Sequence, residues 1–207
     1  MIPQDLKKNL SEAYDRQSKQ RNQSPTQDWK IDERMAFLQR LRDEKKHSLL
    51  EIGSGPGKDS LFFSREGLDV YATDLSDEMV EHCREKGLKA EVMSFDDLQF
   101  PEESFDAVWA LNCLLHVPKE NLPEVLRGIR SVLKKDGLFY LGVYGGISHE
   151  GIWQGDFHEP KRFFSFYEDN ILQSLLSTEF KLEAFHKIPL DEVENGPTHF
   201  QGVVLRK

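Results

Sequence analysis

The chain has 207 residues, of which 38% are hydrophobic, and this size and composition suit a single globular domain over residues 1–207 with a sizeable core. Its 36 acidic residues outnumber its 27 basic ones, and the formal charge of −9 would repel a phosphate backbone, which argues against a nucleic-acid substrate. Two isolated cysteines, no apolar run of ~18 residues and no clustered histidines predict a cytoplasmic protein without a membrane span or a metal site.

The first segment, residues 1–46, is polar and charged, with apolar residues at helical intervals. It predicts two helices joined by a looser stretch over residues 22–28. Because this segment precedes the first strand of the core, we expect it to form a helical cap that covers the sheet.

The core segment, residues 47–144, alternates strands with helices, and this alternation predicts an α/β fold with a doubly wound parallel sheet. We expect strands near residues 48–52, 69–73, 89–93, 105–110 and 137–144, and helices near residues 58–66, 77–86 and 120–133. The basic residues 134–135 and Gly137 are expected to end the last of these helices.

A glycine-rich turn follows the first of these strands and leads into the first helix of the core. Gly53, Gly55 and Gly57 permit a sharp turn and leave bare backbone against which a ligand can lie. The next strand ends at Asp74, about 20 residues further on, where an acidic side chain accepts hydrogen bonds from ribose hydroxyls in βαβ folds. This segment therefore predicts a site for a ligand that contains a nucleoside.

Two classes of cofactor are candidates for binding at this turn. The nicotinamide and flavin fingerprint, G-x-G-x-x-G/A, places a small residue where this chain has Lys58, and a pyrophosphate would meet Asp59 at the start of the helix. Glu51 instead suits a ligand that carries positive charge. S-adenosylmethionine has a sulfonium and an ammonium group and no phosphate, so the sequence favours it over a nicotinamide dinucleotide.

With these features the chain resembles the class I S-adenosylmethionine-dependent methyltransferases, in the small-molecule branch whose first motif is hydrophobic-E/D-x-G-x-G-x-G. Residues 74–79 are similar to the family's D-x-S-x-x-M, and residues 97–106 are similar to its L-P-F-x-x-x-S-F-D stretch. The resemblance covers residues 47–144. It implies these cofactor contacts: Glu51, Gly53, Ser54, Gly55 and Gly57 at the methionine end, Asp74 at the ribose, and Leu75 and Met79 at the adenine.

One position departs from the family pattern. An aspartate usually binds the adenine amino group where this chain has Ser94, so we expect backbone groups of Phe95 and Asp96, or the Asp96 side chain, to supply the acceptor. Asn112 follows the fourth strand, and Tyr14 stands in a Y-D pair that resembles one in the family's N-terminal helix. These two residues complete the predicted cofactor site.

The resemblance also implies the Rossmann-like methyltransferase fold, with a seven-stranded sheet in the order 3-2-1-4-5-7-6 and only strand 7 antiparallel. After the core we expect a loop over residues 145–167, a short helix over 168–177 and a hairpin of strands over 180–188 and 199–205. Residues 145–207 would thus supply the acceptor lid and a C-terminal hairpin, whose last strand inserts between strands 5 and 6.

The acceptor is expected near the loops after strands 1, 4 and 5, because open α/β sheets bind ligands at the carboxyl ends of their strands. Methyl transfer is an in-line displacement, so the enzyme must hold the nucleophile close to the methyl group and exclude water. His116 is a candidate general base, or a residue that positions the acceptor. The loop after strand 5 supplies these candidate substrate contacts: Tyr144, Glu150, Trp153, His158 and Arg162.

The sequence thus predicts a cytoplasmic enzyme that transfers a methyl group from S-adenosylmethionine to a small-molecule acceptor and releases S-adenosylhomocysteine. A protein that binds this cofactor without transferring the methyl group is an alternative, because binding and catalysis use the same loop. A nicotinamide-dependent oxidoreductase is a third hypothesis. The acceptor atom and the oligomeric state stay open, since one fold hosts many chemistries.

Overall fold

The computed structural model describes residues 1–190 and 196–207 and contains a seven-stranded sheet in the order β3-β2-β1-β4-β5-β9-β8. Its strands are β1 (Ser48–Ile52), β2 (Asp69–Asp74), β3 (Lys89–Val92), β4 (Phe105–Leu111), β5 (Leu133–Gly145), β8 (Lys181–Pro189) and β9 (His199–Arg206). β9 runs antiparallel to both β5 and β8, and the pairs among the first five strands are parallel. The predicted strand order and the single antiparallel strand are therefore confirmed.

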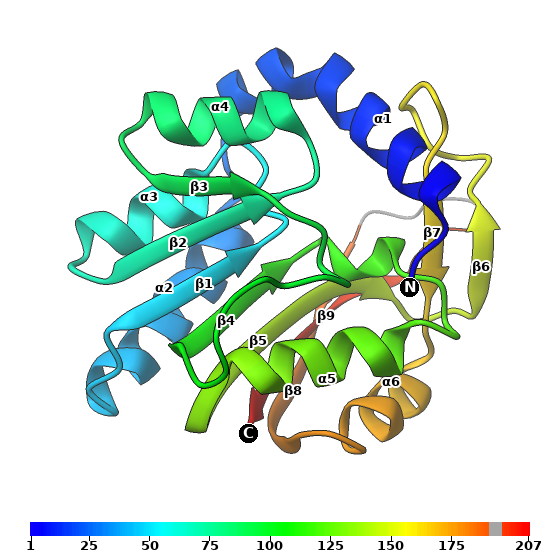
Figure 1. Cartoon of the computed structure of the whole chain (residues 1–207). Helices are drawn as coiled ribbons and strands as arrows, with labels where there is room; N and C mark the ends of the chain where they lie inside the picture. The colour runs from blue at the N-terminus through cyan, green and yellow to red at the C-terminus, as the bar shows by residue number, and fades with distance from the viewer. Residues whose placement is uncertain (191–195) are drawn as a thin grey trace.

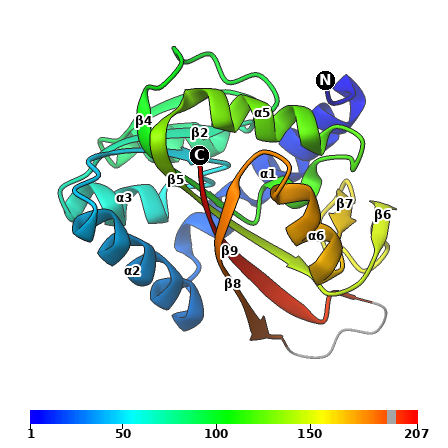
Figure 2. The same cartoon turned by 90° about the horizontal axis from the view of Figure 1, so that it is seen from below.

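Helices cover both faces of this sheet (Figures 1 and 2). They are α1 (Gln4–Gln23), α2 (Asp28–Asp43), α3 (Lys58–Arg65), α4 (Asp77–Glu85), α5 (Leu122–Val132) and α6 (Asp169–Leu176). On one face, Phe37 of α2 and Phe63 of α3 pack against Trp109 of β4, which also stacks on Tyr140 of β5. None of these helices is both long and apolar enough to span a membrane, as judged over the described part of the chain.

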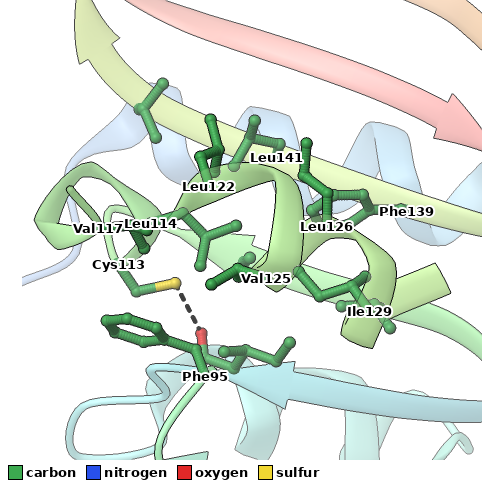
Figure 3. Close-up of a cluster of buried hydrophobic side chains, with 14 of the residues drawn as sticks. Phe95, Cys113, Leu114, Val117, Leu122, Val125, Leu126, Ile129, Phe139 and Leu141 are labelled. Atoms are coloured by element: carbon green, nitrogen blue, oxygen red, sulfur yellow. Dashed lines mark hydrogen bonds between the residues drawn. The ribbon is translucent and has the colours of Figure 1, made fainter. Parts of the chain in front are cut away.

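α5 covers the opposite face and fixes the position of the loop that follows β4. Its apolar residues Leu122, Val125, Leu126 and Ile129 recur at helical spacing, so they form one stripe that packs against the sheet. Figure 3 shows this stripe beside the short 3-10 helix η1 (Leu114–His116). Cys113, just before η1, donates from its thiol to the Ile52 carbonyl at 3.1 Å. The loop after β4 is therefore tied to the end of β1.

α1 crosses the carboxyl edge of the sheet (Figure 1). The Ser11 hydroxyl donates to the Leu75 carbonyl just beyond β2, at 3.3 Å. The Lys7 ammonium lies 2.7 Å from the Asp96 carboxylate beyond β3, and Tyr14 reaches His116 in η1. The N-terminal segment thus lies over the edge where open α/β sheets bind their ligands.

Two expectations about local structure were wrong. Residues 145–167 are not all loop, because β6 (His149–Ile152) and β7 (Phe163–Phe166) form a separate antiparallel pair in which Phe164 and Phe166 are buried. α5 ends at Val132, well before Gly137. A Cβ at Gly137 would lie 2.8 Å from the Lys134 carbonyl oxygen, so this glycine serves a tight backbone approach within β5 rather than a helix cap.

Candidate functional site

The glycine turn after β1 has the left-handed backbone that its sequence predicts. The φ angles are +65° at Gly53, +53° at Gly55 and +77° at Gly57. A Cβ at Gly53 would lie 2.3 Å from the Cβ of Cys113, and one at Gly57 would lie 2.7 Å from the Cys83 sulfur. A Cβ at Gly55 would meet nothing within 4 Å. Gly53 and Gly57 are thus required by packing, whereas Gly55 faces open space.

Asp74, at the end of β2, holds this turn in place. Its carboxylate accepts from the Gly55 N–H at 2.8 Å and from the Ser76 N–H at 2.9 Å. The side chain is buried, and this burial raises the pKa of Asp74 although the backbone hydrogen bonds oppose the shift. Ser54 is buried beside it, and its N–H donates to the Thr73 carbonyl at 2.9 Å. One carboxylate therefore links the turn to the end of the neighbouring strand.

Glu51 lies buried beneath the turn. Its carboxylate accepts a hydrogen bond from the Ser60 hydroxyl, and burial, followed by the nearby Asp59 charge, raises its pKa well above the usual range. Asp59 is itself engaged, by Arg34 at 2.9 Å and by the Trp109 indole N–H at 3.3 Å. Asp59 thus faces α2 and β4 as well as the turn.

Two adjoining cavities lie at this edge of the sheet. The larger one, about 300 Å³, is bounded by residues 21–30 on one side and by the glycine turn on the other. The smaller one, about 50 Å³, is bounded by α1 and the ends of β2, β3 and β4. The predicted site residues that line one or both of them are Tyr14, Glu51, Gly53, Ser54, Gly55, Asp74, Leu75, Phe95, Asn112 and His116.

Asn112 lies where the two cavities meet. Its backbone has a φ of +56°, which is uncommon for a residue with a side chain, and its N–H donates to the Gly142 carbonyl at 2.7 Å. Its Oδ1 is buried without a hydrogen-bond partner among the described residues. A strained residue with an unused buried acceptor, at the rim of a cavity, is suited to a ligand that donates.

The residues near the predicted adenine end are arranged differently from the expectation. The Asp96 carboxylate accepts from the Ile2 N–H at 2.8 Å and from the Ser94 hydroxyl, and it pairs with Lys7. Burial opposes ionisation of Asp96, but these contacts lower its pKa. Met79 is fully buried and lines neither cavity, whereas Met93 lines the smaller one.

His116 belongs to a buried polar network that connects α1 with the segment after β5. Its Nδ1 lies 2.8 Å from the Phe163 carbonyl, which can only accept, so Nδ1 carries the proton in a neutral ring. Nε2 then accepts from the Tyr14 hydroxyl at 2.9 Å, and Arg162 donates to the same hydroxyl at 2.8 Å. Burial, followed by the Arg162 charge, lowers the pKa of His116 to about 3. The imidazole is therefore neutral at physiological pH.

Asp156 anchors the far end of this network. Arg162 donates to it from Nε at 2.9 Å and from an Nη at 2.7 Å, and the His158 Nδ1 lies 3.2 Å away. Burial opposes ionisation of Asp156, but these hydrogen bonds hold its pKa well below the usual range. No sequence pattern marks Asp156, because its partners are recognised only once the chain has folded.

The residues predicted as substrate contacts line neither cavity in this structure. Arg162 and His158 are buried in the network around Asp156. Trp153 packs edge-on against Phe164 and Phe166, and Tyr144 lies edge-on to Phe200. Glu150 is exposed, and its carboxylate accepts from the Lys119 N–H at 2.8 Å. Four of these five side chains therefore contact other side chains of the protein rather than either cavity, and Glu150 lies at the surface.

Residues 50–141 match the family model described as a methyltransferase domain. This match identifies a methyltransferase domain in residues 50–141. The match spans the glycine turn, Asp74, Asn112 and His116, and it agrees with the resemblance found in the sequence.

Relatives of this methyltransferase domain match only part of the chain. An uncharacterised methyltransferase of Schizosaccharomyces pombe is 32% identical over 121 residues, which cover 54% of this chain and 46% of that protein. The 27-O-demethylrifamycin SV methyltransferase of Amycolatopsis mediterranei is 31% identical over 125 residues, which cover 56% of this chain and 44% of that protein. The chain thus matches less than half the length of each of these two relatives.

The fold of the methyltransferase domain also recurs among solved structures. The 1,6-didemethyltoxoflavin N1-methyltransferase of Burkholderia thailandensis, solved with 1,6-didemethyltoxoflavin and S-adenosylhomocysteine bound, has a TM-score of 0.75 at 19% identity. The superposition covers 100% of this chain and 91% of that one. At this identity the likeness concerns the fold alone, and it extends to the N-terminal helices and the last two strands.

Proposed function

We propose that this protein transfers a methyl group from S-adenosylmethionine to a small-molecule acceptor and releases S-adenosylhomocysteine. The observation that carries the proposal is the pairing of Gly55 with Asp74: a left-handed glycine open to a cavity, fixed by a buried carboxylate at the end of the next strand. The absence of a Cβ leaves room for a ligand against bare backbone, and the carboxylate can accept from a ribose.

The chain's residues fit this cofactor along the two adjoining cavities. Asp74 would accept from the ribose hydroxyls, with Leu75 and Phe95 against the adenine in the smaller cavity. Glu51 and the unused Oδ1 of Asn112 would face the methionine ammonium in the larger one. When bound, the cofactor supplies an electrophilic methyl group, and the protein's task is to orient the acceptor and exclude water.

For His116 we propose positioning rather than proton abstraction. Both of its ring nitrogens are engaged, and a pKa of about 3 makes its conjugate acid too strong for the imidazole to retain a proton at neutral pH. Its lone pair instead orients the Tyr14 hydroxyl at the cavity wall, and Arg162 fixes that hydroxyl from the other side. The general-base alternative predicts a kcat that falls with protonation of an essential group near neutral pH.

Several observations support a small-molecule acceptor. The net charge of −9 disfavours a nucleic acid, and two of the similar proteins described above are enzymes named for small-molecule substrates. The cavities are small, and α1 encloses them at one edge of the sheet. We also propose a cytoplasmic location, which the two free, buried cysteines favour.

The test is release of S-adenosylhomocysteine, measured by chromatography, when the protein is incubated with S-adenosylmethionine and pools of phenols, thiols, amines and acidic carbon compounds. We expect acceptor-dependent release by the wild type and none by Gly55→Val. Binding of S-adenosylhomocysteine without release in any pool would contradict the proposal and favour a protein that only binds the cofactor.

A further inference from the structure

The larger cavity has a positively charged wall. Arg21 at the end of α1, Lys30 near the start of α2 and Lys58 at the start of α3 all line it. These three residues come from three separate helices, so their convergence depends on the tertiary fold. It stands out in a chain whose formal charge is −9.

The side-chain contacts of these cations within the described residues are to neutral groups, although the Asp59 charge lies near enough to Lys30 and Lys58 to oppose the lowering of their pKa values. Lys58 donates to the carbonyl and the hydroxyl of Ser24, and the Lys30 ammonium lies 5.1 Å from the centre of the Trp29 ring. The Arg21 guanidinium lies 5.1 Å from the centre of the Tyr14 ring. Within residues 1–190 and 196–207, the Arg21 Nε is buried and has no hydrogen-bond partner.

The two acidic residues that line the same cavity neutralise its positive charge only in part. Asp59 is paired with Arg34 at 2.9 Å. Glu51 lies deeper, and burial raises its pKa and so disfavours its charged form. Burial, followed by the Arg21 charge, lowers the pKa of Lys30 to about 8, although the Asp59 charge opposes the shift.

The proposed cofactor does not complete this charge balance. S-adenosylmethionine brings a sulfonium, an ammonium and a carboxylate, so it adds net positive charge. Its carboxylate can be matched by Arg21, which lines both cavities. Lys30 and Lys58 then still face the cavity, and the carboxylate near them, that of Asp59, is already paired with Arg34. A buried or half-buried charge is stabilised by an opposite charge.

We infer that the acceptor is anionic: a small molecule bearing a carboxylate or a phosphate group, which Lys30 and Lys58 hold in the larger cavity. This inference rests on the proposed function, because it assigns the substrate class of the same site. Binding of the anion also makes the site more favourable for the positively charged cofactor, so the two ligands are expected to bind with positive coupling.

The test uses three probes on protein saturated with S-adenosylhomocysteine: benzoate, its neutral isostere benzamide, and inorganic phosphate, each titrated by calorimetry. We expect at least one anion to bind, and benzamide to bind at least tenfold more weakly than benzoate. Benzoate binding without phosphate binding indicates a carboxylate acceptor, and the reverse indicates a phosphate ester. At pH 8, anion binding should take up protons, because a bound anion raises the pKa of Lys30.

Lys30→Gln and Lys58→Gln are each expected to weaken anion binding by tenfold or more. Lys135→Gln is the matched control, because Lys135 is exposed on β5 and does not line the cavity. Thermal melting checks that each variant is folded. The inference is overturned if neither anion binds the wild type, if benzoate binds and benzamide binds equally well, or if both cavity variants bind anions like the control.

Failure of this inference can be separated from failure of the proposed function. If S-adenosylhomocysteine binds and the anions do not, the acceptor class is wrong and the cofactor assignment stands. If S-adenosylhomocysteine does not bind the wild type, the proposed function fails and the acceptor class falls with it.

Discussion

Gly55→Ala separates the ligand-binding role of the glycine turn from its structural role. The backbone at Gly55 has a φ of +53°, and an added methyl group would meet no atom of the protein within 4 Å. The cost to the ligand-free protein is therefore the left-handed strain alone, about 1–2 kcal/mol. For a domain of this size that corresponds to a fall in melting temperature of roughly 2–8 °C. The methyl group would instead occupy the space proposed for the cofactor.

Two glycines serve as controls. Gly87 also has a left-handed backbone, with a φ of +78°, and open space around its missing Cβ, but it lines neither cavity. Gly87→Ala should lose the same stability and keep its affinity. In Gly53→Ala the added Cβ would lie 2.3 Å from the Cβ of Cys113, so overpacking costs about 1–3 kcal/mol in addition to the left-handed strain. The free energy of unfolding should therefore fall by about 2–5 kcal/mol.

Differential scanning fluorimetry measures stability and isothermal titration with S-adenosylhomocysteine measures affinity. We expect Gly55→Ala to lose at least about tenfold in affinity, which is about 1.4 kcal/mol, while it stays folded. The reasoning would be refuted if Gly55→Ala bound as tightly as the wild type, or if Gly87→Ala lost as much affinity as Gly55→Ala.

Other predictions concern buried charges and the Tyr14 network. Because the folded-state pKa of Glu51 is raised, its protonation stabilises the fold at low pH, and that stability is lost as the pH rises through the raised value. Glu51→Gln should therefore have a higher melting temperature than the ligand-free wild type at pH 7, and the same melting temperature near pH 4. A melting temperature below that of the wild type at pH 7 would contradict this prediction. Arg162→Met leaves the Asp156 carboxylate, whose side chain is fully buried, without its main partner. Arg162→Met should lower the free energy of unfolding, measured by urea denaturation, by about 3–5 kcal/mol, and adding Asp156→Asn should restore part of that loss. An unchanged urea midpoint would contradict this prediction. Tyr14→Phe removes a hydrogen-bond partner from both His116 and Arg162, so it should lower the free energy of unfolding by about 1–3 kcal/mol. It should also lower kcat by a larger factor than cofactor affinity. Equal losses in kcat and affinity would argue against a positioning role.

The sequence predicted the parts of this molecule that local chemistry specifies. Gly53, Gly55 and Gly57 are recognisable because each adopts a conformation that residues with side chains avoid. Asp74 lies at the end of the next strand, as expected, and its hydrogen bond with Gly55 is a contact that the sequence did not predict. The strand order followed from the family resemblance and was confirmed.

Features that depend on distant parts of the chain escaped prediction. Arg21 and Lys30 lie before the core and reach the larger cavity only because α1 and α2 pack at its edge. Asp156 escaped prediction for a different reason: its partner Arg162 is only six residues away, but the segment between them has neither a helical nor a regular alternating pattern. The side chain of Asp96, expected at the adenine, is engaged by Lys7, which is 89 positions earlier in the sequence.

The assignment of S-adenosylmethionine as cofactor is tested most directly by calorimetric titration of the wild-type protein with S-adenosylhomocysteine, run beside NAD in the same buffer. We predict micromolar binding of S-adenosylhomocysteine and none of NAD, because Lys58 stands at the start of α3 where the dinucleotide fingerprint requires a small residue. Binding of NAD in place of S-adenosylhomocysteine would contradict this assignment.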